Sequence, residues 1–193
     1  MDIVHRKEAP DPAAQASCAV VELRQYTLHP GRRDELIALF EREFVESQEA
    51  CGLRLLGLFR DLDDADRFVW LRGFSDMPAR AAALAAFYGG PVWQAHREAA
   101  NATMIDSDDV LLLRPARPDA GFAHDDESAS AATDALVIAM VWQLPLRVGA
   151  DFLPWFERRT LPVLRGAGAR LLASFVSESA ANTFPALPVR EGE

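Results

Sequence analysis

The strongest constraint on the fold is an internal repeat. The stretch from Glu22 to Phe59 is echoed by the stretch from Ile138 to Phe175, at a constant offset of 116 residues and without a gap. FER recurs at 40–42 and 156–158, and RLL recurs at 54–56 and 170–172. A repeat of this length is one supersecondary unit used twice. The sequence therefore predicts two related units, and proteins built from paired units commonly form their pocket from both.

The first copy extends into a longer predicted unit. Apolar alternation indicates strands, helical spacing indicates helices, and Gly52 stands where a left-handed helix cap belongs. The predicted strands are 18–28, 53–60, 67–74 and 110–114, and the predicted helices are 32–50, 78–88 and 91–104. This β-α-β-β-α-β order is ferredoxin-like. We therefore predict an α+β fold of ferredoxin-like antiparallel sheets with helices on one face.

The second copy is incomplete. We predict a tail at 1–17, a first domain at 18–115, a Pro/Ala/Ser/Asp-rich linker at 116–134 and a second, incomplete unit at 135–193. In that unit we expect strands at 136–144 and 169–176, and between them a helix at 151–165 that Pro162 bends or ends early. The remaining strands have no counterpart, so we expect the first unit, another chain or a longer parent chain to cover the open sheet edge.

Composition excludes several classes of function. The net charge of -9 argues against nucleic-acid binding, which needs clustered cations. Without an apolar run of transmembrane or signal-peptide length, we expect a cytoplasmic protein with no membrane partner. Cys18 and Cys51 form neither a CxxC motif nor a disulfide framework. The sequence lacks HExxH, a Cys/His cluster and a phosphate-binding loop, so we predict no metal and no cofactor.

Three stretches carry a resemblance to a known family: ELRQYTLHPGRRDEL at 22–36, RFVWLRGFSDMPAR at 67–80 and PVWQAHREAANATMIDSDDVLLLRP at 91–115. The sequence resembles the NIPSNAP family of the dimeric α/β barrel superfamily, strongly over roughly 19–115 and weakly over 136–193. The resemblance implies a homo-oligomer whose ligands lie between each sheet and its helices or inside a barrel. The family is mostly of unassigned biochemical function, and its superfamily includes cofactor-independent monooxygenases. A shared fold does not assign a reaction.

Two predicted strands carry a polar face. Because side chains alternate along a strand, Glu22, Arg24 and Tyr26 share one face, and Trp70 and Arg72 share a face of another strand. We expect the apolar alternate face to meet the helices, so that these five residues face a partner sheet. They would then line an aromatic-walled cavity that suits an anionic or carbonyl ligand. The alternative is an ion-paired network at a dimer interface.

A predicted helix carries a second candidate cluster. Trp93 and His96 are three residues apart, so they share a helical face. A histidine beside a tryptophan can act as a general base in a dry pocket, as a cofactor-free oxygenase requires. We therefore take His96 as the candidate catalytic residue and Trp93 as a candidate binding residue. The alternative is a partly exposed histidine on a surface helix.

The sequence leaves three functions open. The first is an oligomeric family domain with a small-molecule pocket, the second is a cofactor-independent monooxygenase, and the third is a non-catalytic structural or interaction module. The second copy carries Ile138, Met140 and Trp142 where the first has its polar strand face. We therefore expect the first copy to hold the site and the second to supply packing surface.

Overall fold

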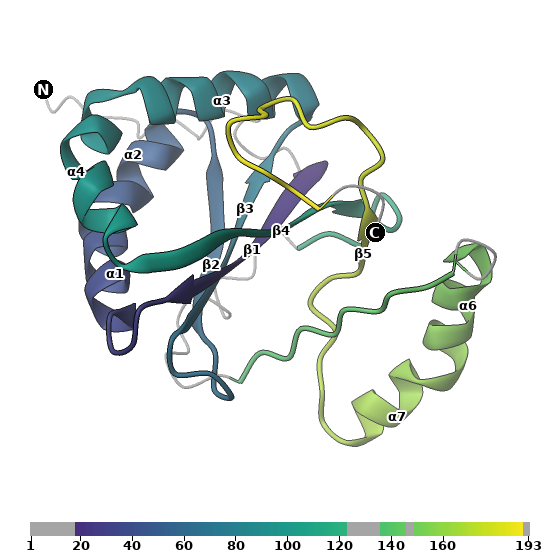
Figure 1. Cartoon of the computed structure of the whole chain (residues 1–193). Coiled ribbons are helices and arrows are strands. Elements are labelled where there is room, and N and C mark those ends of the chain that lie inside the picture. The colour runs from purple at the N-terminus through teal and green to yellow at the C-terminus, as the bar shows by residue number, and fades with distance from the viewer. Residues whose placement is uncertain (1–17, 123–135, 146–148, 191–193) are drawn as a thin grey trace, which may run out of the picture.

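Over the described residues, one five-stranded sheet carries helices on one of its faces (Figure 1). The computed structural model describes residues 18–122, 136–145 and 149–190. Neighbouring strands follow the order β2-β3-β1-β4-β5, and each neighbouring pair is antiparallel. The strands are β1 (Val20–Leu28), β2 (Arg54–Arg60), β3 (Arg67–Phe74), β4 (Met104–Pro115) and β5 (Phe175–Ser177). The predicted α+β class and antiparallel sheet are confirmed.

Helical segments follow β1 and β3, as the ferredoxin-like order requires. They are α1 (Arg33–Leu39), the π-helix η2 (Phe40–Phe44), α2 (Val45–Ala50), α3 (Met77–Gly89) and α4 (Pro91–Asn101). The predicted helix at 32–50 is therefore one helical run interrupted by a π turn. β4 begins earlier than predicted, because its first residues pair with the end of β1 across a register shift.

Turn and capping residues end the helices where their chemistry predicts. Gly52 closes α2 at a φ of 89°, a left-handed conformation that a Cβ would disfavour. The Asp76 carboxylate accepts a hydrogen bond from the Ala79 backbone N–H (2.7 Å) and so caps α3. Pro78 lies in the first turn of α3, where its missing N–H costs no helical hydrogen bond.

The second copy keeps its helix, but only part of its predicted strands forms. Helices α6 (Gly149–Arg159) and α7 (Leu161–Gly166) meet just before Pro162, and Gly168 has the same φ of 89° as its counterpart Gly52. The predicted strand at 136–144 is wrong, because residues 136–145 form no strand. The predicted strand at 169–176 is reduced to β5.

The difference between the copies has a physical reason. β1 is hydrogen-bonded to a strand on each side, whereas no described segment of the second copy supplies such neighbours. A strand exists only where its backbone groups find partners. β5 finds one by pairing with β4, so that Phe175 lies opposite Pro115.

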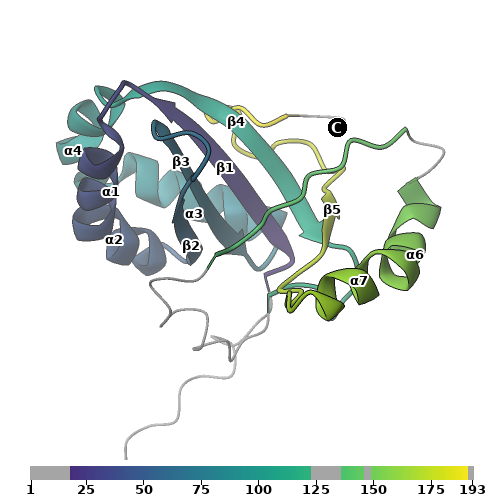
Figure 2. The same ribbon diagram turned by 90° about the horizontal axis from the view of Figure 1, so that it is seen from below.

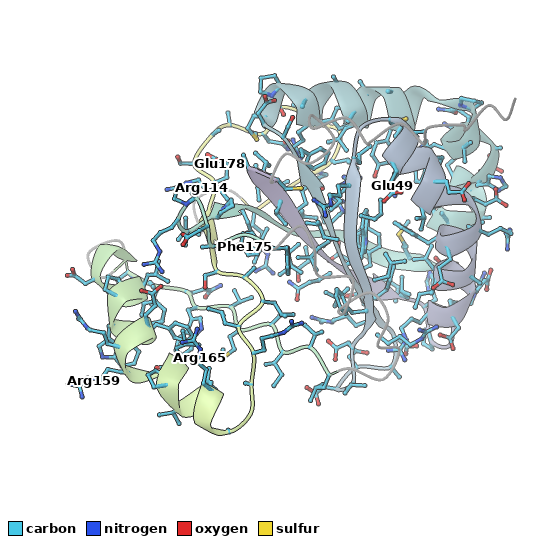
Figure 3. All side chains as sticks on the ribbon, turned by 180° about the vertical axis from the view of Figure 1, so that it is seen from behind. Glu49, Arg114, Arg159, Arg165, Phe175 and Glu178 are labelled. Carbon is cyan, nitrogen blue, oxygen red and sulfur yellow. The ribbon has the colours of Figure 1, made fainter. Side chains whose placement is uncertain are left out.

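Helices α6 and α7 lie beyond the β5 edge, apart from the helices of the first copy (Figure 2). In the view from behind, Arg165 on α7 is well separated from Glu49 on α2 (Figure 3). Phe175 and Glu178 lie near Arg114, where β4 meets β5. The second copy therefore adds an edge strand and a helical pair to the first copy's sheet.

The hydrophobic core lies between the sheet and α1–α4. Aromatic rings from the strands and the helices pack edge to face there, with ring centroids 4.8–5.8 Å apart. Burying one such side chain contributes about 1.5–3 kcal/mol. The buried rings of the core include Phe40, Phe44, Phe68, Trp70, Phe74 and Phe87. This core holds a polar cluster in its interior.

Candidate functional site

A buried carboxylate, Glu22, stands at the centre of the polar cluster. Its Oε2 accepts hydrogen bonds from Arg24 Nη1 and Arg72 Nε, both at 2.7 Å. Its Oε1 accepts one from Arg80 Nε at 2.6 Å. All four side chains are 0–1% exposed to solvent. Three guanidinium groups thus share one carboxylate inside the protein.

Local structure explains how these side chains meet. Glu22 lies opposite Arg72 in the β1–β3 pairing, and Arg24 lies opposite Trp70. Side-chain alternation puts all four on the same face of the sheet. The start of α3, fixed by its N-cap, then places Arg80 over that face.

The predicted orientation of this face is wrong. Glu22 and Arg72 point towards the helices rather than towards a partner sheet. Their polar partners come from the helix layer. Arg80 comes from α3, and Gln48 of α2 accepts a hydrogen bond from Arg72 Nη1 (3.1 Å). The polar face is therefore part of the core of the first copy.

Gln48 and Arg80 are among the members of the cluster that sequence reasoning missed. Each stands at a helix position that shares a face with core residues: Gln48 follows Phe44 by one turn, and Arg80 precedes Leu84 by one turn. A polar residue on the apolar face of a helix is the signal that would have identified both.

Aromatic rings surround the guanidinium groups. The central carbon of Arg24 lies 5.5 Å from the ring centroids of Tyr26 and Trp70, and that of Arg72 lies 5.1 Å from Trp70. Tyr88 of α3 lies 5.8 Å from Arg72 and accepts its hydrogen bond at 3.4 Å. Such cation–π contacts are worth about 0.5–2 kcal/mol each. They stabilise part of the buried positive charge.

The cluster joins most of the candidate residues identified in the sequence. Tyr26 accepts a hydrogen bond from Arg24 Nε at 3.0 Å. Trp93 packs against Tyr88 with ring centroids 4.9 Å apart, so it forms a second layer behind the cluster. The candidates brought together by direct contact are Glu22, Arg24, Tyr26, Trp70 and Arg72.

Positive charge in the cluster exceeds negative charge. Nη2 of Arg72 and Nη2 of Arg80 are both buried, and neither has a hydrogen-bond partner among the described residues. Tyrosine, glutamine and tryptophan side chains add no formal negative charge at neutral pH. Buried N–H groups without an acceptor cost free energy. Among the described residues, the cluster therefore holds three cations against one carboxylate.

The charges shift the titration of their neighbours. Burial alone would raise the pKa of the Glu22 carboxyl, but the guanidiniums of Arg72, Arg24 and Arg80 outweigh burial and hold it far below its usual range. The pKa of Arg80 is lowered, chiefly by burial. Glu22 raises it, and the positive charges of Arg72 and Arg24 lower it further. Burial raises the pKa of Tyr26. Glu22 is therefore ionised throughout the physiological range.

We expect acid to destabilise the protein through Glu22. Its folded pKa lies below the value of about 4.3 typical of an unfolded glutamate. The stabilisation is therefore complete above the unfolded pKa and is lost as the pH falls towards the folded pKa. Urea denaturation between pH 7 and pH 3 should show a steeper loss in the wild type than in Glu22→Gln. Parallel curves would contradict this expectation.

The family model described as NIPSNAP matches residues 21–118, which contain the whole cluster around Glu22. The chain belongs to the NIPSNAP family. The match spans β1 to β4 and the helices between them, so the buried polar cluster lies within the NIPSNAP part of the chain.

Solved structures similar to this chain include other NIPSNAP proteins. An uncharacterized NIPSNAP-like domain protein from Burkholderia xenovorans is 25% identical, with 64% of this chain and 94% of that chain covered and a TM-score of 0.46. A NIPSNAP family protein with unknown function from Agrobacterium tumefaciens is 22% identical, with coverages of 53% and 91% and a TM-score of 0.48. A putative antibiotic biosynthesis monooxygenase from Chloroflexus aurantiacus is 17% identical, with coverages of 51% and 93% and a TM-score of 0.41. No curated protein matches the chain.

His96 of this NIPSNAP chain lies away from the cluster. Its Nε2 is 3.4 Å from Glu43 Oε2, and its ring centroid is 6.3 Å from that of Phe44. The side chain is 32% exposed. Among the described residues, no interaction joins His96 to the arginines. Sequence reasoning grouped His96 with Trp93, but only Trp93 adjoins the cluster through Tyr88.

A pocket lies away from the arginine cluster. A shallow pocket of about 210 Å³ is lined by residues that include Cys18, Val21, Arg54 and Phe122. It lies on the opposite face of the sheet, because Val21 alternates with Glu22.

Within 18–122, 136–145 and 149–190, no group of three or more His, Cys, Asp or Glu residues could hold a metal ion. No helix in these ranges has the length and apolar character needed to cross a membrane.

Proposed function

We propose that this NIPSNAP domain binds a small molecule through an anionic group, between β1 and β3 on one side and α3 on the other. The observation that carries the proposal is the buried charge imbalance: three arginines share Glu22, and Nη2 of Arg72 and Arg80 lacks partners among the described residues. Guanidinium groups recognise carboxylates and phosphates through paired N–H donors.

The aromatic surroundings favour an organic anion over a free inorganic ion. Trp70, Tyr88 and Trp93 place three rings beside or behind the arginines. Ligand sites typically combine an apolar lining with a few polar groups that fix orientation. The cluster has both parts, with Arg72 and Arg80 as the polar groups.

The test is ligand-induced stabilisation. Small carboxylates at about ten times their Kd should raise the melting temperature by about 3–5 °C. The rise should disappear in Arg80→Met and persist in Arg60→Met, which alters an exposed arginine paired with Asp34. An equal rise in Arg80→Met would place the binding site elsewhere, and no rise in any variant would leave the cluster with a structural role alone.

We also propose that residues 136–142 form an interface with a second copy of the chain. This segment repeats the sequence of β1, and six of its apolar side chains are exposed: Leu136, Val137, Ile138, Met140, Val141 and Trp142. No strand among the described residues pairs with it. An extended apolar segment without a strand partner is suited to adding to a sheet edge.

The oligomer proposal predicts a change in sedimentation. Val141→Asp should shift the protein towards the monomer, because a carboxylate would be buried without a partner at the interface. Leu62→Asp is the matched control, since Leu62 is also an exposed apolar residue but lies between β2 and β3. A monomeric wild type would contradict the proposal.

We infer a reducing, cytoplasmic compartment, because both Cys18 and Cys51 are free thiols.

We do not extend the proposal to oxygenase chemistry. His96 pairs with Glu43 at the protein surface and makes no contact with the arginine cluster among the described residues. A general base must come within hydrogen-bond reach of its substrate.

A further inference from the structure

We infer that residues 182–184 cover the outer side of the anion site by occupying Nη1 of Arg80, and that the ligand which displaces them is an aromatic carboxylate. This inference rests on the proposed anion-binding function and adds to it the ligand class and a control on access. The segment from Glu178 to Arg190 leaves β5, runs beside α3 and returns across β4 (Figure 1).

Two oxygen atoms of this segment occupy the outer side of the cluster. Asn182 Oδ1 and Thr183 Oγ1 accept hydrogen bonds from the same atom, Arg80 Nη1, at 3.0 and 3.2 Å. Both oxygens are neutral, so they satisfy a donor without neutralising its charge. An anionic oxygen in their place would form a stronger, charge-assisted hydrogen bond.

An aromatic ring of the segment lies next to these oxygens. Phe184 stacks on Tyr88, with ring centroids 5.9 Å apart and an angle of 25° between the ring planes. Tyr88 in turn contacts Arg72 and Trp93. The segment thus places two oxygen atoms on a guanidinium and an aromatic ring on the neighbouring tyrosine. An aromatic carboxylate would present the same groups, a pair of oxygens and a ring.

The segment is anchored to β4 at its ends and held by side-chain contacts between them. The Glu178 N–H donates to Leu112 O and the Arg190 N–H donates to Val110 O, both at 2.8 Å, so both anchors lie on β4. Between the anchors the segment has neither helix nor strand, and Thr183 is exposed. Asn182 Nδ2 donates to Leu187 O (2.9 Å), Thr183 Oγ1 donates to Met77 O (3.2 Å), and Phe184 packs against the core. A ligand that displaces residues 182–184 must replace these contacts, while both anchors on β4 can remain in place.

The test compares the wild-type chain with Asn182→Ala/Phe184→Ala. Calorimetric titration with benzoate should give an affinity at least about tenfold higher for the double variant, because the wild type must first release its own segment. Cyclohexanecarboxylate, which lacks the aromatic ring, and benzamide, which lacks the charge, should both bind more weakly than benzoate. Phe122→Ala is the matched control, since it removes a ring contact with Phe175 away from the site and should leave the affinity unchanged.

Three other results would each contradict a different part of the proposal. Equal affinity of wild type and double variant would overturn the displacement inference while leaving the proposed anion binding intact. Equal binding of benzoate and cyclohexanecarboxylate by the double variant would overturn the aromatic ligand class. No binding by either form would overturn the proposed function itself. If circular dichroism shows that the double variant is unfolded, Thr183→Ala provides the same comparison, because this exposed side chain also bonds Arg80.

Discussion

Glu22→Gln is expected to destabilise the protein by about 3–5 kcal/mol, as measured by urea denaturation at pH 7. The carboxylate receives hydrogen bonds from Arg24, Arg72 and Arg80, and all four groups are buried. Glutamine keeps the size of the side chain and removes its charge. The three cations would then repel one another without a buried counter-charge, and the amide N–H₂ would add donors where only acceptors are needed.

The control for this prediction is the same substitution at the surface. Glu35 pairs with Arg32 on α1, where both side chains are well exposed. Solvent screens such a pair, so Glu35→Gln should leave stability unchanged within error. A loss below about 1 kcal/mol in Glu22→Gln would contradict the role of Glu22 as the buried counter-charge of the three arginines.

Trp70→Ala is expected to cost about 3–5 kcal/mol, again measured by urea denaturation. Its side chain is 2% exposed and packs against Phe40 and Tyr26, with centroid distances of 4.8 and 5.7 Å. It also supports the guanidiniums of Arg24 and Arg72. Truncation would open a cavity in the core and remove a π surface from two buried cations.

Two further substitutions separate these effects. Trp70→Phe keeps an aromatic face and removes the indole N–H, which is buried without a partner among the described residues. It should therefore cost much less than Trp70→Ala. Trp155→Ala alters a tryptophan on α6 that is 47% exposed, and it should change stability little. Similar losses for Trp70→Phe and Trp70→Ala would show that ring size, rather than the π surface, controls packing at this position.

Much of the fold of the first copy could be predicted from local patterns. Alternation along β1 placed Glu22, Arg24 and Tyr26 on one face, and the structure brings them together. Gly52 and Asp76 marked helix ends because left-handed φ values and N-caps depend on one or two residues. These features need no knowledge of distant contacts.

The second copy shows the limit of local prediction. Residues 136–144 match β1 at an offset of 116 residues, yet they form no strand. β1 is a strand because β3 and β4 pair with it on both sides. Sequence similarity to a strand cannot supply those neighbours, whereas the helix of the second copy forms because its hydrogen bonds lie within the segment.

The sequence by itself determined the alternation, the helix ends and the residues that share the polar face of β1 and β3. Only the tertiary structure decided that this face meets the helices, that Arg80 completes the cluster and that Asn182 reaches it. The physical reason is separation along the chain: Arg80 bonds Glu22 across 58 positions and Asn182 across 102. Contacts of that range depend on how the sheet, α3 and the segment after β5 pack together, and no local pattern encodes that packing.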